Sequence, residues 1–306
     1  MNDKISIVTG FFSLGRDRWN RYDRSNEKYY RYFEFWANIH NDMVIYADPE
    51  SAAIVRRVRV EKFGRKNTRI IEIEDFLSLD KELYNAIQGT TGNDFALKFH
   101  LRTRNPESWN AEYNYMMLLK EWCVNDAIEK GYVGGMVAWV DFGWNHGGKY
   151  YTDPKDFDFE WKYPFEEDKM NIFALRELDD GIPVFEVLSN MNSYLIGGLI
   201  IGPATLWPKF AAMIRGNMLA LTRLGLMDDD QLILLMTYRQ APEMFKVRRS
   251  NWFEGMQLCS GQTFKTIPPH RPDSILRKIK LSLRNRRRSF LFALRWYRTI
   301  KNVKYD

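Results

Sequence analysis

Short apolar runs alternate with longer amphipathic stretches through the first half of the chain. Apolar runs of strand length that end at turn-forming residues are typical of buried strands, and apolar residues recurring every three or four positions are typical of helices. The predicted strands are residues 5–9, 43–47, 69–73 and 136–140. The predicted helices between them are residues 26–40, 54–63, 74–87 and 110–130. This alternation implies right-handed crossovers and predicts an α/β fold, a mostly parallel central sheet with helices on both faces.

The second half of the chain has a less regular pattern. Residues 89–109 are rich in Gly, Asn, Asp and Pro and predict a long loop, of a length that is more often functional than idle. Residues 150–177 are acidic and aromatic, with no predicted strand. Beyond them the pattern predicts strands at 183–188, 194–201 and 244–247, and helices at 203–224 and 232–238.

The last stretch of the chain predicts a basic amphipathic helix over residues 274–304. Its apolar positions recur at steps of three and four: Leu276, Ile279, Leu283, Phe290, Leu294 and Tyr297. Residues 271–306 hold twelve Lys or Arg against two Asp, a charge of +10 in a chain of +6, so residues 1–270 carry −4. We therefore divide the chain into a domain at 1–270 and a basic tail at 271–306.

A basic helix with an apolar stripe matches one that lies on an anionic lipid surface. Nucleic acid is the alternative ligand for such a tail. It is the less favoured partner, because arms that bind nucleic acid do not need an apolar stripe.

Composition narrows the class of protein further. An apolar content of 45% in 306 residues supports a sizeable core. Cys123 and Cys259 form neither a disulfide framework nor a metal-binding spacing, which predicts reduced thiols in the cytoplasm. No signal-peptide pattern opens the chain, and no run approaches the roughly 18 apolar residues of a membrane span. We expect a protein that is neither exported nor integral to a membrane.

Candidate chemistry gathers where predicted strands end. Asp141 follows the strand at 136–140 and precedes Gly143, and Asp48 follows the strand at 43–47 in the same way. Ligands of open α/β sheets bind at this edge, so Asp141 is placed to hold a hard cation or a ribose hydroxyl. The alternative is an Asp that caps a turn.

Cationic groups lie near the same edge. Arg16 and Arg18 follow the strand that ends at Thr9 and Gly10, and an arginine fork matches a phosphate; solvated surface arginines are the alternative. Lys120 lies in an apolar helical run, so it either extends its amine to solvent or points a fixed cation at the site.

Two further patterns suggest a site in the second half. The pair Gly197 and Gly198 within a predicted strand indicates a bulge or a close ligand approach. Asp228, Asp229 and Asp230 precede a helix, where capping and the helix dipole account for one or two carboxylates but not for three.

Several motifs together resemble the HtrL/YibB family over roughly residues 5–260. They are Ile-Val-Thr-Gly-Phe-Phe at 7–12 with Gly15, Arg16 and Trp19, Met-Val-Ile-Tyr-Ala-Asp at 43–48, the helix at 113–120, and Trp-Val-Asp-Phe-Gly at 139–143. That bacterial family is associated with lipopolysaccharide and surface-glycan synthesis, and its fold is similar to GT-A glycosyltransferases. The GT-A hallmark is an Asp-x-Asp motif that holds a divalent metal on the donor diphosphate. Here Asp141 is the first Asp, and Phe142 and Gly143 take the remaining places.

The resemblance implies a glycosyltransferase that moves a sugar from a nucleoside diphosphate sugar, expected to be a UDP-sugar, onto a lipid-linked surface glycan such as lipopolysaccharide core, O-antigen or capsule. Asp141 would hold Mn²⁺ or Mg²⁺, and Asp229, then Asp230, would be the catalytic base. The implied donor-binding residues are Thr9, Gly10, Arg16, Asp48, Asn110, Lys120, Asp141, Gly143, Gly197 and Gly198. His146 is the histidine nearest to this site.

The expected location is cytoplasmic, at the inner face of the cytoplasmic membrane, to which residues 274–304 would bind. Two other functions remain open. One is a non-catalytic GT-A-like partner in a glycan-assembly complex. The other is a nucleic-acid-binding protein that acts through its basic tail.

Overall fold

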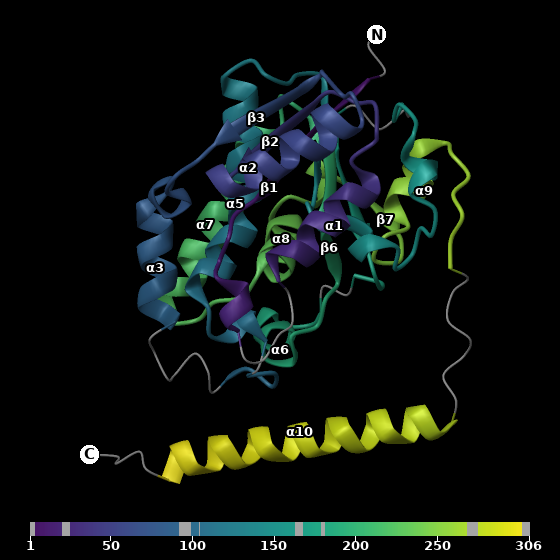
Figure 1. Cartoon of the computed structure of the whole chain (residues 1–306). Helices are drawn as coiled ribbons and strands as arrows, with labels where there is room; N and C mark the ends of the chain where they lie inside the picture. Colours follow the sequence, from purple (N-terminus) through teal and green to yellow (C-terminus); the bar gives the residue numbers. More distant parts are fainter. Residues whose placement is uncertain are drawn as a thin grey trace.

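The computed structural model describes residues 4–19, 25–91, 99–103, 105–162, 168–178, 181–267 and 275–301 (Figure 1). Within them, a central sheet has the strand order β3-β2-β1-β4-β6-β5-β7. The strands are β1 Ile5–Phe11, β2 Met43–Ala47, β3 Thr68–Glu72, β4 Met136–Val140, β5 Met170–Ala174, β6 Leu195–Pro203 and β7 Phe245–Arg249.

The sheet is mostly parallel, as predicted. β1 pairs in parallel with β2 and β4, β2 with β3, and β5 with β7. β6 is the exception, because it runs antiparallel to both β4 and β5. Its N-terminal end therefore meets the C-terminal end of β4, where Val140 pairs with Leu199.

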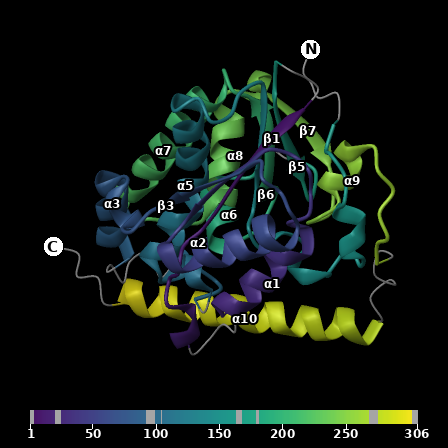
Figure 2. The same ribbon diagram turned by 45° about the horizontal axis from the view of Figure 1, so that its top comes forward.

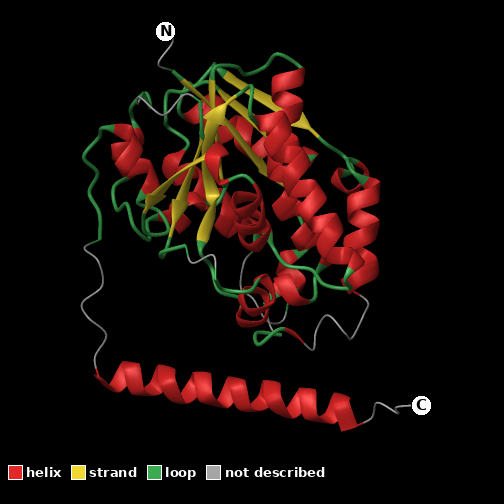
Figure 3. Cartoon of the chain, turned by 180° about the vertical axis from the view of Figure 1, so that it is seen from behind, coloured by secondary structure: helices red, strands yellow, loops and turns green. Residues whose placement is uncertain are grey.

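Helices cover both faces of the sheet. The described helices are α1 Asn26–Trp36, α2 Pro49–Val55, α3 Lys81–Thr91, α5 Ala111–Glu129, α6 Val184–Asn190, α7 Trp207–Arg223, α8 Asp230–Gln240, α9 Gly255–Ser260 and α10 Ile275–Lys301, the last of which lies across one end of the body (Figure 1). A π-helical turn, η2 (Arg56–Lys62), extends α2, and short 3₁₀ turns join other elements. Figures 2 and 3 show α5, α7 and α8 together on one face, with α1 and α9 across the sheet. No helix in the described ranges is both long and apolar enough to cross a bilayer.

Two apolar cores follow from the alternation of side chains along each strand. In β1, Val8 joins the core under α5 and α7, and Ile7 joins the core under α1. In β4, Trp139 belongs to the first core and Val140 to the second. The continuous apolar runs in the sequence thus reflect strands buried on both sides.

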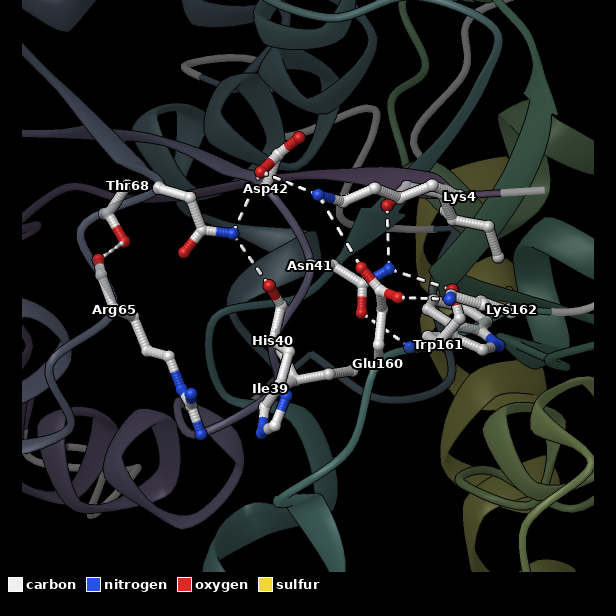
Figure 4. A network of polar contacts seen from close by, with 12 residues as sticks. Lys4, Ile39, His40, Asn41, Asp42, Arg65, Thr68, Glu160, Trp161 and Lys162 are labelled. Carbon is white, nitrogen blue, oxygen red and sulfur yellow. Dashed lines mark hydrogen bonds and ion pairs between the residues drawn. The ribbon is translucent and has the colours of Figure 1, made fainter. Parts of the chain in front are cut away.

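A polar network fixes the N-terminal edge of the sheet (Figure 4). The Asn41 amide donates to the carbonyls of Ile5 (2.8 Å) and Trp161 (2.9 Å), and its oxygen accepts from the Trp161 N–H (2.7 Å). Lys4 reaches Asp42 at 3.1 Å. These bonds tie β1 to the segments before β2 and β5, at the edge opposite the C-terminal ends of β1 and β4.

The structure corrects three boundaries. Residues 183–188, predicted as a strand, begin helix α6: Pro183 lacks an N–H and suits a helix start, while Val187 and Leu188 turn into the core. β5 lies within the segment at 150–177, where no strand was predicted. Helix α3 continues to Thr91, into the predicted loop at 89–109. The predicted domain boundary at residue 270 lies outside the described residues, as do 302–304 at the end of the predicted tail helix.

Candidate functional site

Two adjoining cavities open at the C-terminal ends of β1 and β4, where strands connect to opposite sides of the sheet. Such a switch point is the usual ligand crevice of an open α/β sheet. The first cavity has a volume of ≈ 120 Å³ and the second ≈ 290 Å³. Six residues are shared by the linings of the two cavities: Tyr113, Met117, Lys120, Asp141, Gly143 and His146. The two cavities therefore meet at these residues.

Lys120 is the central cation of this junction. Its side chain is 3% exposed, and its ammonium lies 2.5 Å from Oδ2 of Asp230 and 3.1 Å from Oδ1 of Asp141. It also donates to the carbonyl of Gly197 (3.2 Å). Burial alone would lower the pKa of Lys120, but Asp141 and Asp230 outweigh burial and raise this pKa above its ordinary value. Lys120 is therefore a fixed buried cation and does not extend to solvent.

The glycine pair in β6 allows the two carboxylates to approach the strand. A Cβ at Gly197 would lie 1.6 Å from Oδ2 of Asp230, and a Cβ at Gly198 would lie 3.0 Å from Oδ2 of Asp141. Trp139 also donates its indole N–H to Oδ1 of Asp141 (2.8 Å). The sequence predicted a bulge or a close ligand approach at these glycines; in the structure the groups that approach them are carboxylates of the protein itself.

The three consecutive aspartates are all buried at the start of α8. Asp229 is the N-cap and accepts from the N–H of Gln231 (3.1 Å), while Asp228 accepts from the N–H of Asp229 (2.9 Å). Burial and then repulsion by neighbouring carboxylates raise the pKa of Asp229 well above its usual range. Burial likewise raises the pKa of Asp228 to about 8. Asp229 and Asp230 line the second cavity.

Arg16 provides the cation of the first cavity. It is buried, it donates from Nη1 to the carbonyl of Phe12 (3.1 Å), and its guanidinium lies over the rings of Tyr29 (4.8 Å) and Phe11 (5.2 Å). Arg18 is exposed and lines neither cavity. The surface alternative therefore holds for Arg18 and is wrong for Arg16.

A strained loop brings His146 to the junction. Asn145 (φ 60°) and His146 (φ 44°) have left-handed backbones, which costs a non-glycine residue roughly 1–2 kcal/mol. The Asn145 side chain fixes the loop by donating to the carbonyl of Tyr151 (2.9 Å) and accepting from the N–H groups of Tyr150 and Tyr151. The His146 ring stacks on Tyr32 (5.4 Å between centroids) and meets the edge of Phe253 (5.1 Å).

Most predicted site residues converge on the cavities. Those that line one or both are Gly10, Arg16, Lys120, Asp141, Gly143, Gly197, Gly198, Asp229 and Asp230. Thr9, Asp48 and Asn110 line neither of the two cavities, so their expected contacts with a ligand stay predictions. Asp48 caps α2 and accepts from the N–H groups of Ser13 and Ser51, Asn110 caps α5, and Thr9 is fully buried.

Sequence reasoning missed several residues that line the cavities. Tyr29, on the helix predicted at 26–40, lines the first cavity but is not among the predicted site residues. Glu107, from the 3₁₀ turn Pro106–Ser108, and Trp252, from the turn before α9, line the second cavity. The signal available for Glu107 was the length of the predicted loop at 89–109, and we find no sequence signal for Tyr29.

The residues around Asp141 do not fit a divalent metal. Phe142 is 3% exposed and stacks on Phe33 (4.4 Å between centroids), and Gly143 has no side chain, so neither supplies a second ligand. Magnesium and manganese need several oxygen ligands. Among the residues that the structure describes, no three His, Cys, Asp or Glu side chains gather in a metal-binding arrangement. The ammonium of Lys120 already lies between the carboxylates of Asp141 and Asp230, in the position that a dication bridging them would need.

Comparison with known proteins identifies relatives. Residues 3–260 match a family described as "Bacterial protein of unknown function (HtrL_YibB)". Protein HtrL of Escherichia coli (strain K12) is 30% identical over 270 residues, which cover 83% of this chain and 92% of that protein. Among solved structures, mouse xyloside xylosyltransferase 1 in its apo form has a TM-score of 0.40 and 10% identity, over 80% of this chain and 84% of that one.

Proposed function

Since the chain belongs to the HtrL_YibB family, whose function is unknown, we propose an activity from the geometry of its site. The proposal is a glycosyltransferase that moves a sugar from a nucleoside diphosphate sugar, expected to be a UDP-sugar, onto a hydroxyl of a glycan. The main support for this proposal is the ammonium of Lys120, which lies between the carboxylates of Asp141 and Asp230. It lies where a cavity lined by aromatic rings meets a cavity lined by carboxylates.

The first cavity suits a nucleotide. Its wall includes Phe11, Phe12 and Tyr29, of which the half-buried Tyr29 ring offers a face to a planar base, and Arg16 offers a guanidinium for phosphate oxygens. The second cavity suits sugars. Its four carboxylates, Glu107, Asp141, Asp229 and Asp230, can accept hydrogen bonds from hydroxyl groups, and the Trp252 ring, 43% exposed, offers an apolar face. A donor that spans the junction would place its diphosphate beside Lys120.

Two cations would stabilise the leaving diphosphate. Negative charge grows on this group as the glycosidic bond to the nucleotide breaks, and a fixed cation in a site with little water stabilises it without reorganising. Lys120 supplies such a charge at the junction, and Arg16 supplies a second charge in the first cavity. No step is assigned to a divalent metal, because the residues around Asp141 do not provide its ligands.

Asp229 is our first candidate for the general base. A base must accept the proton of the acceptor hydroxyl, and a raised pKa makes a carboxylate a stronger base. Asp229 lines the second cavity and has such a pKa. Asp230, in contrast, is paired with Lys120, which favours a role in positioning.

The test is the purified chain with a panel of nucleoside diphosphate sugars and glycan acceptors. We expect one donor to raise the melting temperature, and Asp229→Asn to abolish transfer while donor binding persists. Asp168→Asn is the control, since Asp168 is exposed and lines neither cavity. If no nucleoside diphosphate sugar binds, the proposal is wrong.

We further propose that the acceptor is a lipid-linked surface glycan, such as lipopolysaccharide core, O-antigen or capsule. The protein would then work in the cytoplasm at the inner face of the cytoplasmic membrane. The exposed apolar and basic side chains of helix α10 support this proposal.

A second candidate function is a non-catalytic partner in a glycan-assembly complex. The absence of a second carboxylate after Asp141 favours it, because Phe142 and Gly143 provide none. In that case, cells carrying Asp229→Asn would make unchanged glycan, whereas loss of the whole protein would alter it.

A further inference from the structure

Helix α10 exposes a row of large apolar side chains. They are Ile275, Leu276, Ile279, Leu283, Phe290, Leu291 and Tyr297, and Phe290, for example, is 67% exposed. At about 100° per residue, most of this row falls on one side of the helix. We refer to Ile275, Ile279, Leu283, Phe290 and Tyr297 as the outer stripe.

A different side of α10 holds the helix to the body. The Trp296 ring lies 4.8 Å from the Phe99 ring, which itself lies 4.9 Å from Phe185 of α6. Phe292 packs beside Trp296 (6.3 Å). Helical spacing places Phe292 and Trp296 more than about 90° from the centre of the outer stripe. Figure 1 accordingly shows α10 lying across the end of the molecule that carries α6.

Positive charge follows the outer stripe. Residues 275–301 contain ten Lys or Arg and no Asp or Glu. Lys280, Arg284, Arg287 and Arg298 are exposed, and their spacing places them beside the stripe and away from Trp296. The surface that faces away from the body is therefore apolar along one strip and basic along the next.

We infer that this surface of α10 docks on an anionic membrane and turns the second cavity toward it. Apolar side chains enter the boundary between head groups and acyl chains, while neighbouring Lys and Arg bind lipid phosphates. Nucleic acid would use the charges but would leave the exposed apolar row uncovered. Docking by α10 does not depend on the proposed function. Only the identity of the molecule that enters the cavity from the membrane, a lipid-linked glycan, rests on it.

The orientation follows from the attachment point of α10. Just after Phe99, the N–H of Leu101 donates to the carbonyl of Ser189 in α6 (2.9 Å). The two segments joined there then supply Glu107 and Ser193 to the wall of the second cavity. α10 is thus anchored beside the rim of this cavity, so a glycan on a lipid would enter it from the bilayer surface.

Flotation of the full-length protein with vesicles tests the docking. We expect binding to phosphatidylcholine vesicles that contain phosphatidylglycerol, and none without it. Phe290→Glu should weaken binding roughly tenfold or more. It removes an aromatic ring that would enter the bilayer, and it adds a negative charge that anionic lipids repel. The matched control is Leu224→Glu, which changes an equally exposed side chain (68%) on the body and should bind as the wild type does.

The charges are tested with Arg284→Glu and Arg287→Glu together, against Arg223→Glu as control on the body. The pair should lose vesicle binding, and the control should keep it. If no variant floats less than the wild type, docking by α10 is overturned. If DNA or RNA is bound through Arg284 and Arg287 while Phe290→Glu binds it normally, the tail is a nucleic-acid arm instead.

Orientation is measured with a fluorescent label on an introduced cysteine. Cys123 and Cys259 are both buried, so a label reports the new position. A label at Ser193→Cys, on the second cavity, should be quenched by spin-labelled lipid, and one at Lys66→Cys, before β3 on the opposite edge, should not. Equal quenching would contradict the orientation. Donor binding measured on the same samples separates the two proposals, because vesicle docking can fail while nucleotide binding persists.

Discussion

The ammonium of Lys120 lies 2.5 Å from the carboxylate of Asp230, a residue 110 positions later in the chain. The same ammonium lies 3.1 Å from Asp141. One buried cation therefore joins α5, the end of β4 and the start of α8 at the junction of two cavities. Its replacement should affect both folding and ligand binding, and these effects can be separated.

Lys120→Met should destabilise the protein by about 3–5 kcal/mol, because it leaves two carboxylates near one another without their cation. Lys120→Met combined with Asp230→Asn should recover part of this loss, since only Asp141 then stays charged, and its side chain is 39% exposed to water. Neither variant should bind a nucleoside diphosphate tightly. Chemical denaturation and calorimetric titration measure the two effects. Lys209→Met, at an exposed position of α7, is the control and should match the wild type in both stability and binding. If Lys120→Met also matches the wild type, the role of the buried cation is refuted.

Gly197→Ala should disrupt the site more than a single methyl group suggests. The added Cβ would lie 1.6 Å from Oδ2 of Asp230, so the pair with Lys120 must move. We expect a loss of roughly 2 kcal/mol or more, measured by urea unfolding. Gly216→Ala is the matched control: nothing lies within 4 Å of its Cβ in α7, and alanine should stabilise that helix by about 0.5–1 kcal/mol.

Glu121→Gln should change how stability depends on pH. Burial raises the pKa of Glu121 to about 8, so the folded protein holds a proton that the unfolded chain releases near its ordinary pKa. The stabilisation from this neutral acid is complete below the ordinary pKa and is lost as the pH rises to about 8, by up to about 1.4 kcal/mol per pH unit. The glutamine variant should lack the part of this decline that Glu121 causes, while Asp228 and Asp229, whose pKa values burial also raises, keep theirs.

Thermal unfolding at about pH 5 and about pH 9 measures the effect of Glu121→Gln. Its melting temperature relative to wild type should be higher at the alkaline pH. Glu129→Gln, on an exposed turn of the same helix, should show no such difference. A parallel shift of both variants would show that Glu121 is not the titrating group.

His146→Gly should separate ligand binding from folding. Glycine relieves the left-handed strain at φ 44° but removes the ring that lines both cavities. The free energy of unfolding should change by less than about 1 kcal/mol, since the relieved strain offsets the lost ring contacts. Affinity for the donor, measured by titration, should fall clearly. Unchanged affinity would place His146 outside the ligand-binding surface.

Nucleoside diphosphate binding should not require a divalent metal. Lys120 lies between the two carboxylates, and Phe142 and Gly143 supply no further ligand. Titrations of UDP with EDTA and with Mn²⁺ or Mg²⁺ should give the same affinity. A strong gain with Mn²⁺, lost in Asp141→Asn, would restore the metal site first expected from the sequence.

Much of the fold was predictable because buried strands and amphipathic helices leave local patterns. β2 and β4 fall on their predicted residues, and α5 lies within one residue of its predicted start. α6 was mistaken for a strand, since a short apolar run has no period that distinguishes helix from strand. β5 was missed because its surroundings in sequence are acidic and aromatic.

The sequence by itself determined the α/β class, the family resemblance, the exposed basic helix and the carboxylates at strand and helix ends. The tertiary structure alone decided which of these groups meet. β6 turns antiparallel beside β4, and this brings Gly197 and Asp230 to Asp141 and buries Lys120 between them. Asp48 lies directly after a buried strand, as Asp141 does, but its carboxylate caps helix α2. The reason is physical: local pattern records which face of an element is buried, whereas strand order and packing between distant segments decide what each buried group touches.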